Sequence, residues 1–138
     1  MKVIVQRLRT RLKASCSSDN GAAVVDFVMV GGLLTLIFIS IIQLTLVLHV
    51  RNTLIDAAAS GARYGTLADR TPADAEGRTE TLIRGSISGS FAEDISVAQD
   101  NAYGVPTLRV TVRAPLPVLG LFGPSNVMVV TGHAALQR

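Results

Sequence analysis

The chain has 138 residues, of which 49% are hydrophobic and only 17% charged, whereas ordinary soluble domains carry about 25% charged residues. One cysteine and two histidines exclude an internal disulfide framework and a cysteine-rich zinc site. The formal net charge of +3 arises in residues 1–21, which hold five basic side chains and one acid. Residues 22–138 are close to neutral, so they offer no basic face to nucleic acid.

A long apolar segment follows the basic tail. Residues 27–48 contain 22 positions without a charged side chain. As a helix they would be about 33 Å long, which matches the roughly 30 Å hydrocarbon core of a bilayer. We therefore expect a transmembrane helix over residues 22–50, surrounded by membrane lipid. A soluble core helix would have to be apolar on every face within a very small domain, and a cleaved secretory signal has an apolar region of only about 7–15 residues.

The flanking charges predict the orientation of this helix. Five basic residues precede the apolar run, and Arg51 is the only one immediately after it. The positive-inside rule then places residues 1–21 in the cytoplasm as a basic leader and residues 51–138 on the far side. The sequence thus predicts a single-pass protein of the cell inner (cytoplasmic) membrane with a cytoplasmic N-terminus.

After the apolar run, the sequence pattern predicts helix over two further segments. No proline interrupts residues 51–65, so the helix is expected to continue out of the bilayer. Thr71 and Pro72 then supply an N-cap and a first helical position for a second helix. Its amphipathic pattern extends to about residue 88.

The last third of the chain has the period of strands. Residues 107–114 alternate apolar and polar side chains, which predicts a half-buried strand. Residues 95–99 form a shorter candidate strand, residues 100–105 supply turn residues between the two, and residues 127–136 read as a third strand. The segment 115–125 is unusually apolar for a loop, and we expect it under the helix or at the membrane surface. The predicted fold class is α+β, with a long N-terminal transmembrane helix extending into a small extracytoplasmic domain of one more helix and a three-stranded antiparallel sheet.

Small side chains form a stripe on the helix just after the predicted membrane segment. Ala57, Gly61 and Gly65 recur every four residues, with Ala58 and Ala62 beside them. Such a stripe allows another backbone to approach closely, within the subunit or in a partner. The alternative is a helix that is merely rich in small residues and weakened by its two glycines.

The junction between the basic tail and the apolar run has an unusual pattern. Gly21 is followed by four small apolar residues, then by Asp26 and Phe27. A carboxylate in a membrane helix costs about 2.5–3.5 kcal/mol at the bilayer centre and less near its edge. Asp26 is therefore either an acid that reaches water at the membrane edge or a group with a function there.

This junction resembles the leader region of prepilins, the precursors of type IV filament subunits. The resemblance implies cleavage after Gly21 by a prepilin peptidase, with Ala22 as the new N-terminus. It also implies that Asp26, where these proteins usually have Glu, and the aromatic Phe27 act in assembly. The carboxylate of Asp26 would neutralise the new amine in an apolar environment.

The segment after the apolar run narrows the resemblance to TadE-like proteins, minor pseudopilins of tight-adherence (Flp) pilus systems. Nine positions match their signature: Val50, Arg51, Asn52, Ala57, Ala58, Gly61, Ala62, Arg63 and Tyr64. The resemblance implies a minor pilin-like subunit that helps to assemble a Flp/Tad-type pilus for adhesion or secretion. Its partners would be other pilin or pseudopilin subunits and the assembly machinery, and after processing it would be found in the pilus.

The residues give no support to an enzyme. Asp74, Glu76 and Glu80 are spaced like a solvated helix face, with Arg78 and Arg84 among them. We therefore expect no catalytic, cofactor-binding or metal-binding site, and no cofactor. The alternative from another functional class is an unprocessed single-pass anchor that displays a small extracytoplasmic binding domain. The Gly21, Asp26 and Phe27 pattern distinguishes the two, because only a prepilin requires it.

Overall fold

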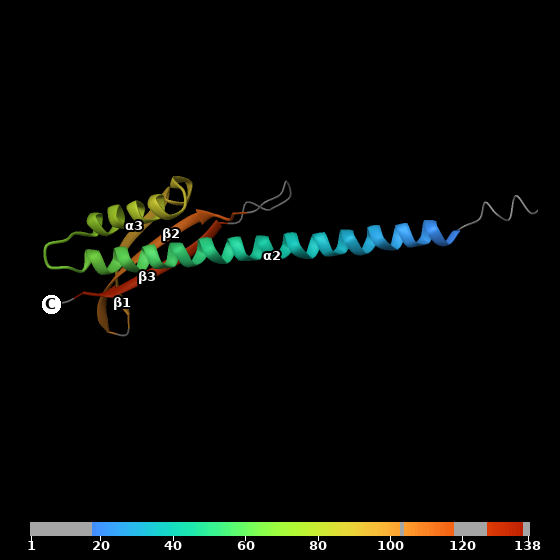
Figure 1. Ribbon diagram of the computed structural model, residues 1–138. Coiled ribbons are helices and arrows are strands. Elements are labelled where there is room, and N and C mark those ends of the chain that lie inside the picture. Colours follow the sequence, from blue (N-terminus) through green and yellow to red (C-terminus); the bar gives the residue numbers. More distant parts are fainter. Residues whose placement is uncertain (1–17, 103, 118–126, 137–138) are drawn as a thin grey trace, which may run out of the picture. The chain divides into compact units, whose positions relative to one another are not determined.

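The computed structural model describes residues 18–102, 104–117 and 127–136 (Figure 1). Residues 1–17 of the predicted leader and most of the apolar segment 115–125 lie outside this description. The elements in chain order are the helix α2 (Ser18–Gly65), the helix α3 (Pro72–Ser86), the 3-10 turn η1 (Gly89–Phe91), and the strands β1 (Asp94–Ala102), β2 (Val105–Pro115) and β3 (Val127–Ala135). The predicted α+β class, with a long apolar helix, a second helix and a three-stranded antiparallel sheet, is confirmed.

The helix α2 is a single unbroken element of 48 residues. It continues through residues 51–65 as the absence of proline predicts. The described residues form two units, one that ends at Ile41 and one that begins at Ile42. The second unit therefore begins inside the charge-free run of residues 27–48.

The start of α3 has the geometry that its sequence predicts. Thr71 is the N-cap in an extended conformation, and Pro72 opens the helix. The backbone N–H of Asp74 donates to Thr71 Oγ1 at 3.3 Å, and the Thr71 N–H donates back to the Asp74 carboxylate at 2.8 Å. This reciprocal pair satisfies two donors that a helix start otherwise leaves free.

The end of α3 differs slightly from the expectation. The helix stops at Ser86 rather than near residue 88, and Phe91 lies on the separate turn η1. Ser88 is extended and its side chain accepts from the backbone N–H of Ser90, so it starts a new turn. Serine side chains in this stretch compete for backbone hydrogen bonds, and the glycines lose much backbone entropy in a helix, so both disfavour its continuation.

The sheet has the strand order β1-β2-β3, and both pairs are antiparallel. The expected turn over residues 100–105 is wrong in length, because β1 continues and the last pair is Ala102 with Val105. Gly104 has a φ of +79°, a conformation that a two-residue connection requires and glycine adopts without strain. Asp100 and its neighbours therefore pair along the strands instead of turning.

The core of the second unit lies between one face of the sheet and the two helices. In Figure 1 the C-terminal part of α2 and α3 lie side by side along the sheet. The alternation predicted for β2 is confirmed, since Leu108, Val110 and Val112 are buried. From α2 the core receives Val50 and Leu54, and the remaining buried side chains are Ala57, Ala58, Ala62, Ala75, Thr79, Ile83, Ala92, Thr107, Ala114, Met128 and Val130.

One contact that sequence inspection missed sets the distance between α2 and the sheet. Gly132 in β3 faces the helix backbone, where an added Cβ would overlap atoms of Ala58 and Ala59. A glycine in a strand interior often marks such a close approach of another backbone. The small Ala58, which is fully buried, completes the contact from the helix side.

Candidate functional site

The predicted processing junction lies at the start of α2. Gly21, Ala22, Asp26 and Phe27 all belong to this helix and are exposed. A Cβ at Gly21 would meet no described atom within 4 Å, and the Phe27 ring is 78% exposed. Asp26 lies one helical turn beyond Ala22, a rise of about 6 Å. Among the residues that the structure describes, none covers the junction, so a partner can reach it.

The first unit presents apolar side chains around its whole circumference. Large hydrophobic residues are exposed from Val24 to Ile41. The two hydroxyl groups in this stretch donate within the helix, Thr35 Oγ1 to the Gly31 oxygen and Ser40 Oγ to the Leu36 oxygen, each at 2.8 Å. Such internal pairing is what a helix in hydrocarbon needs, because lipid offers no partner to polar groups.

The small-residue stripe lies against α3 in the second unit. A Cβ at Gly61 would overlap Thr79 Oγ1 and lie 2.8 Å from the Ala75 oxygen. A Cβ at Gly65 would lie 2.6 Å from both Ala75 Cβ and a methyl carbon of Leu108. Both glycines thus lie at an internal contact, and Ala57, like them, is buried. The structure places this stripe inside the subunit rather than on its surface.

The other signature residues have two different environments. Arg51, Asn52 and Arg63 are exposed on α2. Tyr64 is half-buried, and the guanidinium carbon of Arg70 lies 4.7 Å from the centre of its ring. On the α3 side Arg78 lies 5.9 Å from the same ring. Cation–π contacts of this kind hold the α2–α3 connection against the end of α2, a role that spacing alone did not reveal.

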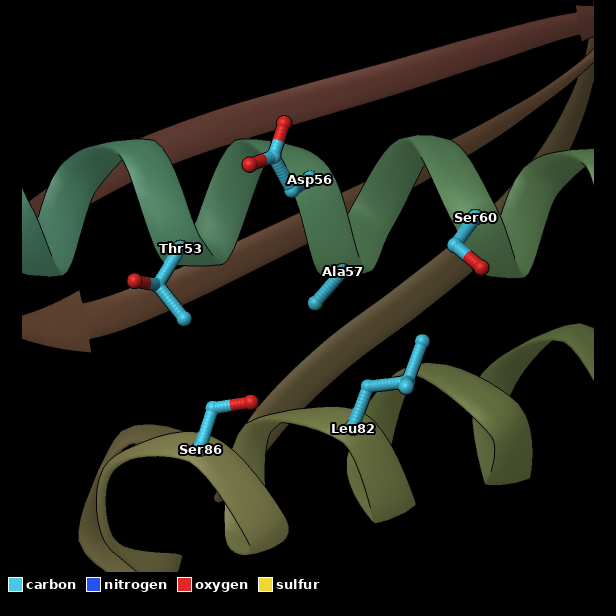
Figure 2. A pocket seen from close by; sticks show the side chains of 6 residues that line it. All are labelled: Thr53, Asp56, Ala57, Ser60, Leu82 and Ser86. Carbon is cyan, nitrogen blue, oxygen red and sulfur yellow. The ribbon is translucent and has the colours of Figure 1, made fainter.

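A shallow groove of about 320 Å³ runs between α2 and α3 (Figure 2). Thr53 and Ala57 point from α2 towards α3, and Leu82 points back from α3, while Asp56 points away from α3. Ser60 and Ser86 complete the lining. The Thr53 hydroxyl donates to the His49 oxygen at 2.9 Å, so it is already paired within its helix. The groove therefore brings together hydroxyls and small apolar groups, with a single carboxylate among its lining residues.

The charged residues of α3 and the two histidines do not converge. Arg84 Nε lies 2.8 Å from Glu80 Oε1 in an exposed pair one turn apart. His49 on α2 and His133 on β3 are exposed and belong to different elements. Within residues 18–102, 104–117 and 127–136, no three His, Cys, Asp or Glu side chains group closely enough to hold a metal ion.

The fold and the site together define a class of protein. One helix in the described part of the chain is long and apolar enough to cross a membrane, and it continues into a small α+β unit, which fits a single-pass membrane protein. The family model described as TadE-like protein matches residues 21–63. This match confirms, over residues 21–63, the resemblance to TadE-like proteins that the sequence predicts; that family is a structural kind of protein associated with Tad pili. Comparisons with curated proteins and with solved structures give no match.

Proposed function

We propose that this protein is a minor pilin-like subunit of the inner membrane, processed by a prepilin peptidase and used to assemble a Flp/Tad-type pilus for adhesion or secretion. Its cytoplasmic leader would be residues 1–21, its transmembrane helix residues 22–50 and its extracytoplasmic domain residues 51–138. The partners would be the peptidase, other pilin or pseudopilin subunits, the assembly machinery and membrane lipid. No catalytic, cofactor or metal role is proposed.

The position of the junction within α2 supports this proposal most directly. The bond between Gly21 and Ala22 lies in the first turn of a helix that begins at Ser18. The first four N–H groups of a helix lack an intrahelical acceptor, so this turn opens at little cost. A peptidase can therefore reach an extended backbone there without melting the apolar helix. The family match also begins at residue 21.

Asp26 would act after cleavage. Processing leaves a charged amine at Ala22, in a helix whose neighbouring side chains are exposed and apolar. An unpaired charge buried in such surroundings costs several kcal/mol, which a carboxylate partner offsets. Asp26 is one turn away on the same helix and is exposed, so it is available to the amine of its own or of an adjacent subunit.

Processing is tested by the intact mass of the full chain, expressed with and without a prepilin peptidase. We expect the peptidase to remove residues 1–21, and we expect Gly21→Trp to block cleavage because the bulky side chain cannot enter a peptidase site shaped for glycine. Gly31→Trp is the matched control, since Gly31 also has open space around it in the same helix. Retention of Met1 in the presence of the peptidase would favour the unprocessed single-pass anchor.

Orientation has its own test. Cys16 is the only cysteine of the chain and lies in the leader. In the uncleaved Gly21→Trp variant, a membrane-impermeant maleimide should label Cys16 in inverted membrane vesicles but not in intact spheroplasts. Labelling from the outside would reverse the proposed topology.

A further inference from the structure

The second unit and the apolar run overlap along α2. The charge-free run reaches Leu48, and the second unit begins at Ile42. Seven residues belong to both, which corresponds to about 10 Å of helix. Any part of the second unit that packs beside residues 42–48 therefore lies at the depth of the bilayer or of its headgroup layer.

The end of the sheet where β2 finishes and β3 begins packs there. Gln43 lies in the overlap, and its side-chain Nε2 donates to the Pro117 oxygen at 2.8 Å, although the two residues are 74 positions apart. Pro117 follows directly after β2, whose last residue Pro115 pairs with Val127 of β3. A backbone carbonyl beyond a strand end normally bonds to water, and here a side-chain amide replaces it, as a lipid environment requires.

A second contact gives the height of Val127 independently. Gly132 of β3 lies against Ala58 of α2. The five residues from Gly132 back to Val127 cover about 16 Å of strand, which equals about 11 residues of helix. Because β3 crosses α2 obliquely (Figure 1), 11 residues is the largest offset, and Val127 lies between the level of Ala58 and that of about residue 47, on the side towards the overlap.

The exposed side chains at this end are apolar. Ile42, Leu44, Leu48 and Val127 are between 46% and 60% exposed, and Leu116, next to Pro117 in the chain, is half-buried. We call these five residues the basal surface. None of the five is charged.

The exposed side chains next to the basal surface are polar or charged. His49, Arg51 and Asn52 are the exposed residues that follow on α2. On the sheet, Arg113 pairs with Asp94 at 3.7 Å, and both side chains are at least half exposed. A polar band above an apolar surface is the arrangement of elements that lie at the boundary between a membrane and water.

We propose that the basal surface contacts membrane lipid, so that the β2–β3 end of the second unit lies in the membrane interface. The partner is the lipid surface, because Ile42, Leu44 and Leu48 of the basal surface belong to the charge-free run of residues 27–48. The domain would thus be held by α2 and by the β2–β3 end together. This inference depends on α2 crossing the membrane and not on processing or pilus assembly.

The chain contains no tryptophan, so single tryptophans report on depth in the full chain reconstituted in nanodiscs. Val127→Trp tests the basal surface, and Val105→Trp is the matched control, an exposed valine at the opposite end of β2. We expect lipids with brominated acyl chains to quench most of the fluorescence of the Val127→Trp variant, and iodide to quench that of the Val105→Trp variant. Iodide quenching of both variants would overturn the proposal. Blue-shifted emission of the Val127→Trp variant without bromine quenching would also overturn it, because a second copy of the chain would then cover the surface.

Cysteine substitutions at the same positions are a control, because cysteine is smaller than tryptophan and disturbs the fold less. In a Cys16→Ser background, Val127→Cys and Val105→Cys are labelled with a charged maleimide in the same nanodiscs. We expect much slower labelling at position 127 than at position 105. Equal rates, with unchanged hydrogen exchange in β2, would show that Val127 faces water and would refute the lipid contact.

Discussion

Gly61→Ala tests the contact between α2 and α3, because one methyl group must enter space that the structure leaves for hydrogen alone. The new Cβ would overlap Thr79 Oγ1 and lie 2.8 Å from the Ala75 oxygen. Thr79 is fully buried, and its hydroxyl donates to the same Ala75 oxygen at 2.8 Å. The methyl group therefore competes with a buried hydrogen bond, and either the helices separate or Thr79 changes rotamer.

The magnitude follows from three contributions. Overpacking costs about 1–3 kcal/mol, and a buried hydroxyl that loses its partner costs about 1–3 kcal/mol more. Alanine offsets about 1 kcal/mol, because its helix propensity exceeds that of glycine. If Thr79 loses its acceptor, the free energy of unfolding of the second unit should fall by about 1–5 kcal/mol. That is a large part of the roughly 5–15 kcal/mol typical of a domain.

Hydrogen exchange of the β2 amides in the full chain in nanodiscs measures this loss without unfolding the membrane helix. Gly77→Ala in α3 is the matched control, since a Cβ there meets no described atom within 4 Å. It should slow exchange or leave it unchanged through the gain of about 1 kcal/mol in helix propensity. Adding Thr79→Ala to Gly61→Ala should restore part of the protection. Equal exchange in the two single alanine variants would refute the close contact.

Three further predictions address other parts of the chain. Asp26→Ala should leave the membrane level of the subunit unchanged or higher but abolish surface filaments, whereas Asp26→Glu should keep both; normal filaments in the alanine strain would contradict the assembly role. Gly132→Ala should speed hydrogen exchange in β3 by destabilising the second unit by about 1–3 kcal/mol, because the new Cβ would overlap backbone atoms of Ala58 that cannot rotate away; unchanged exchange would argue against this close packing. Backbone and side-chain hydrogen bonds from Thr71, with the nearby Arg70, lower the pKa of Asp74 from its ordinary value of 3.8, so the capping box stabilises α3 fully above that pH and loses this contribution as the pH falls through the lower folded pKa. Asp74→Asn should remove this part of the acid sensitivity, measured by thermal unfolding across that pH range.

The elements that the sequence predicted best carry strong local signals. The N-cap at Thr71 and the first helical position at Pro72 are properties of two consecutive residues, and α3 begins there as expected. The burial of alternate residues in β2 likewise follows from a period of two. The turn before Val105 was misjudged because Asp100 and Asn101 are common turn residues, yet Gly104 allows a shorter connection that keeps them in β1.

The start of the second unit could not be predicted from hydropathy. A helix face buried against a sheet and one buried in lipid both require apolar side chains, so the run of residues 27–48 looks uniform. Only long-range contacts separate the two environments, such as Gln43 with the Pro117 oxygen. The residue that packs against Gly61 could not be predicted either. The spacing of small residues indicates a packing face, but it does not show whether Thr79 or another subunit lies against that face.

The continuity of α2 has a mechanical consequence. No proline interrupts Ser18–Gly65, so the helix that begins at the junction is the same element that carries Val50 and Leu54 into the core. A pull along the axis of α2 strains its contacts with the sheet and α3 together, in shear, instead of peeling them away one at a time. Resistance to such a force is governed by the rate of unfolding and not by equilibrium stability. A pull on the apolar part of α2 is therefore transmitted directly to the core of the second unit, through Val50 and Leu54.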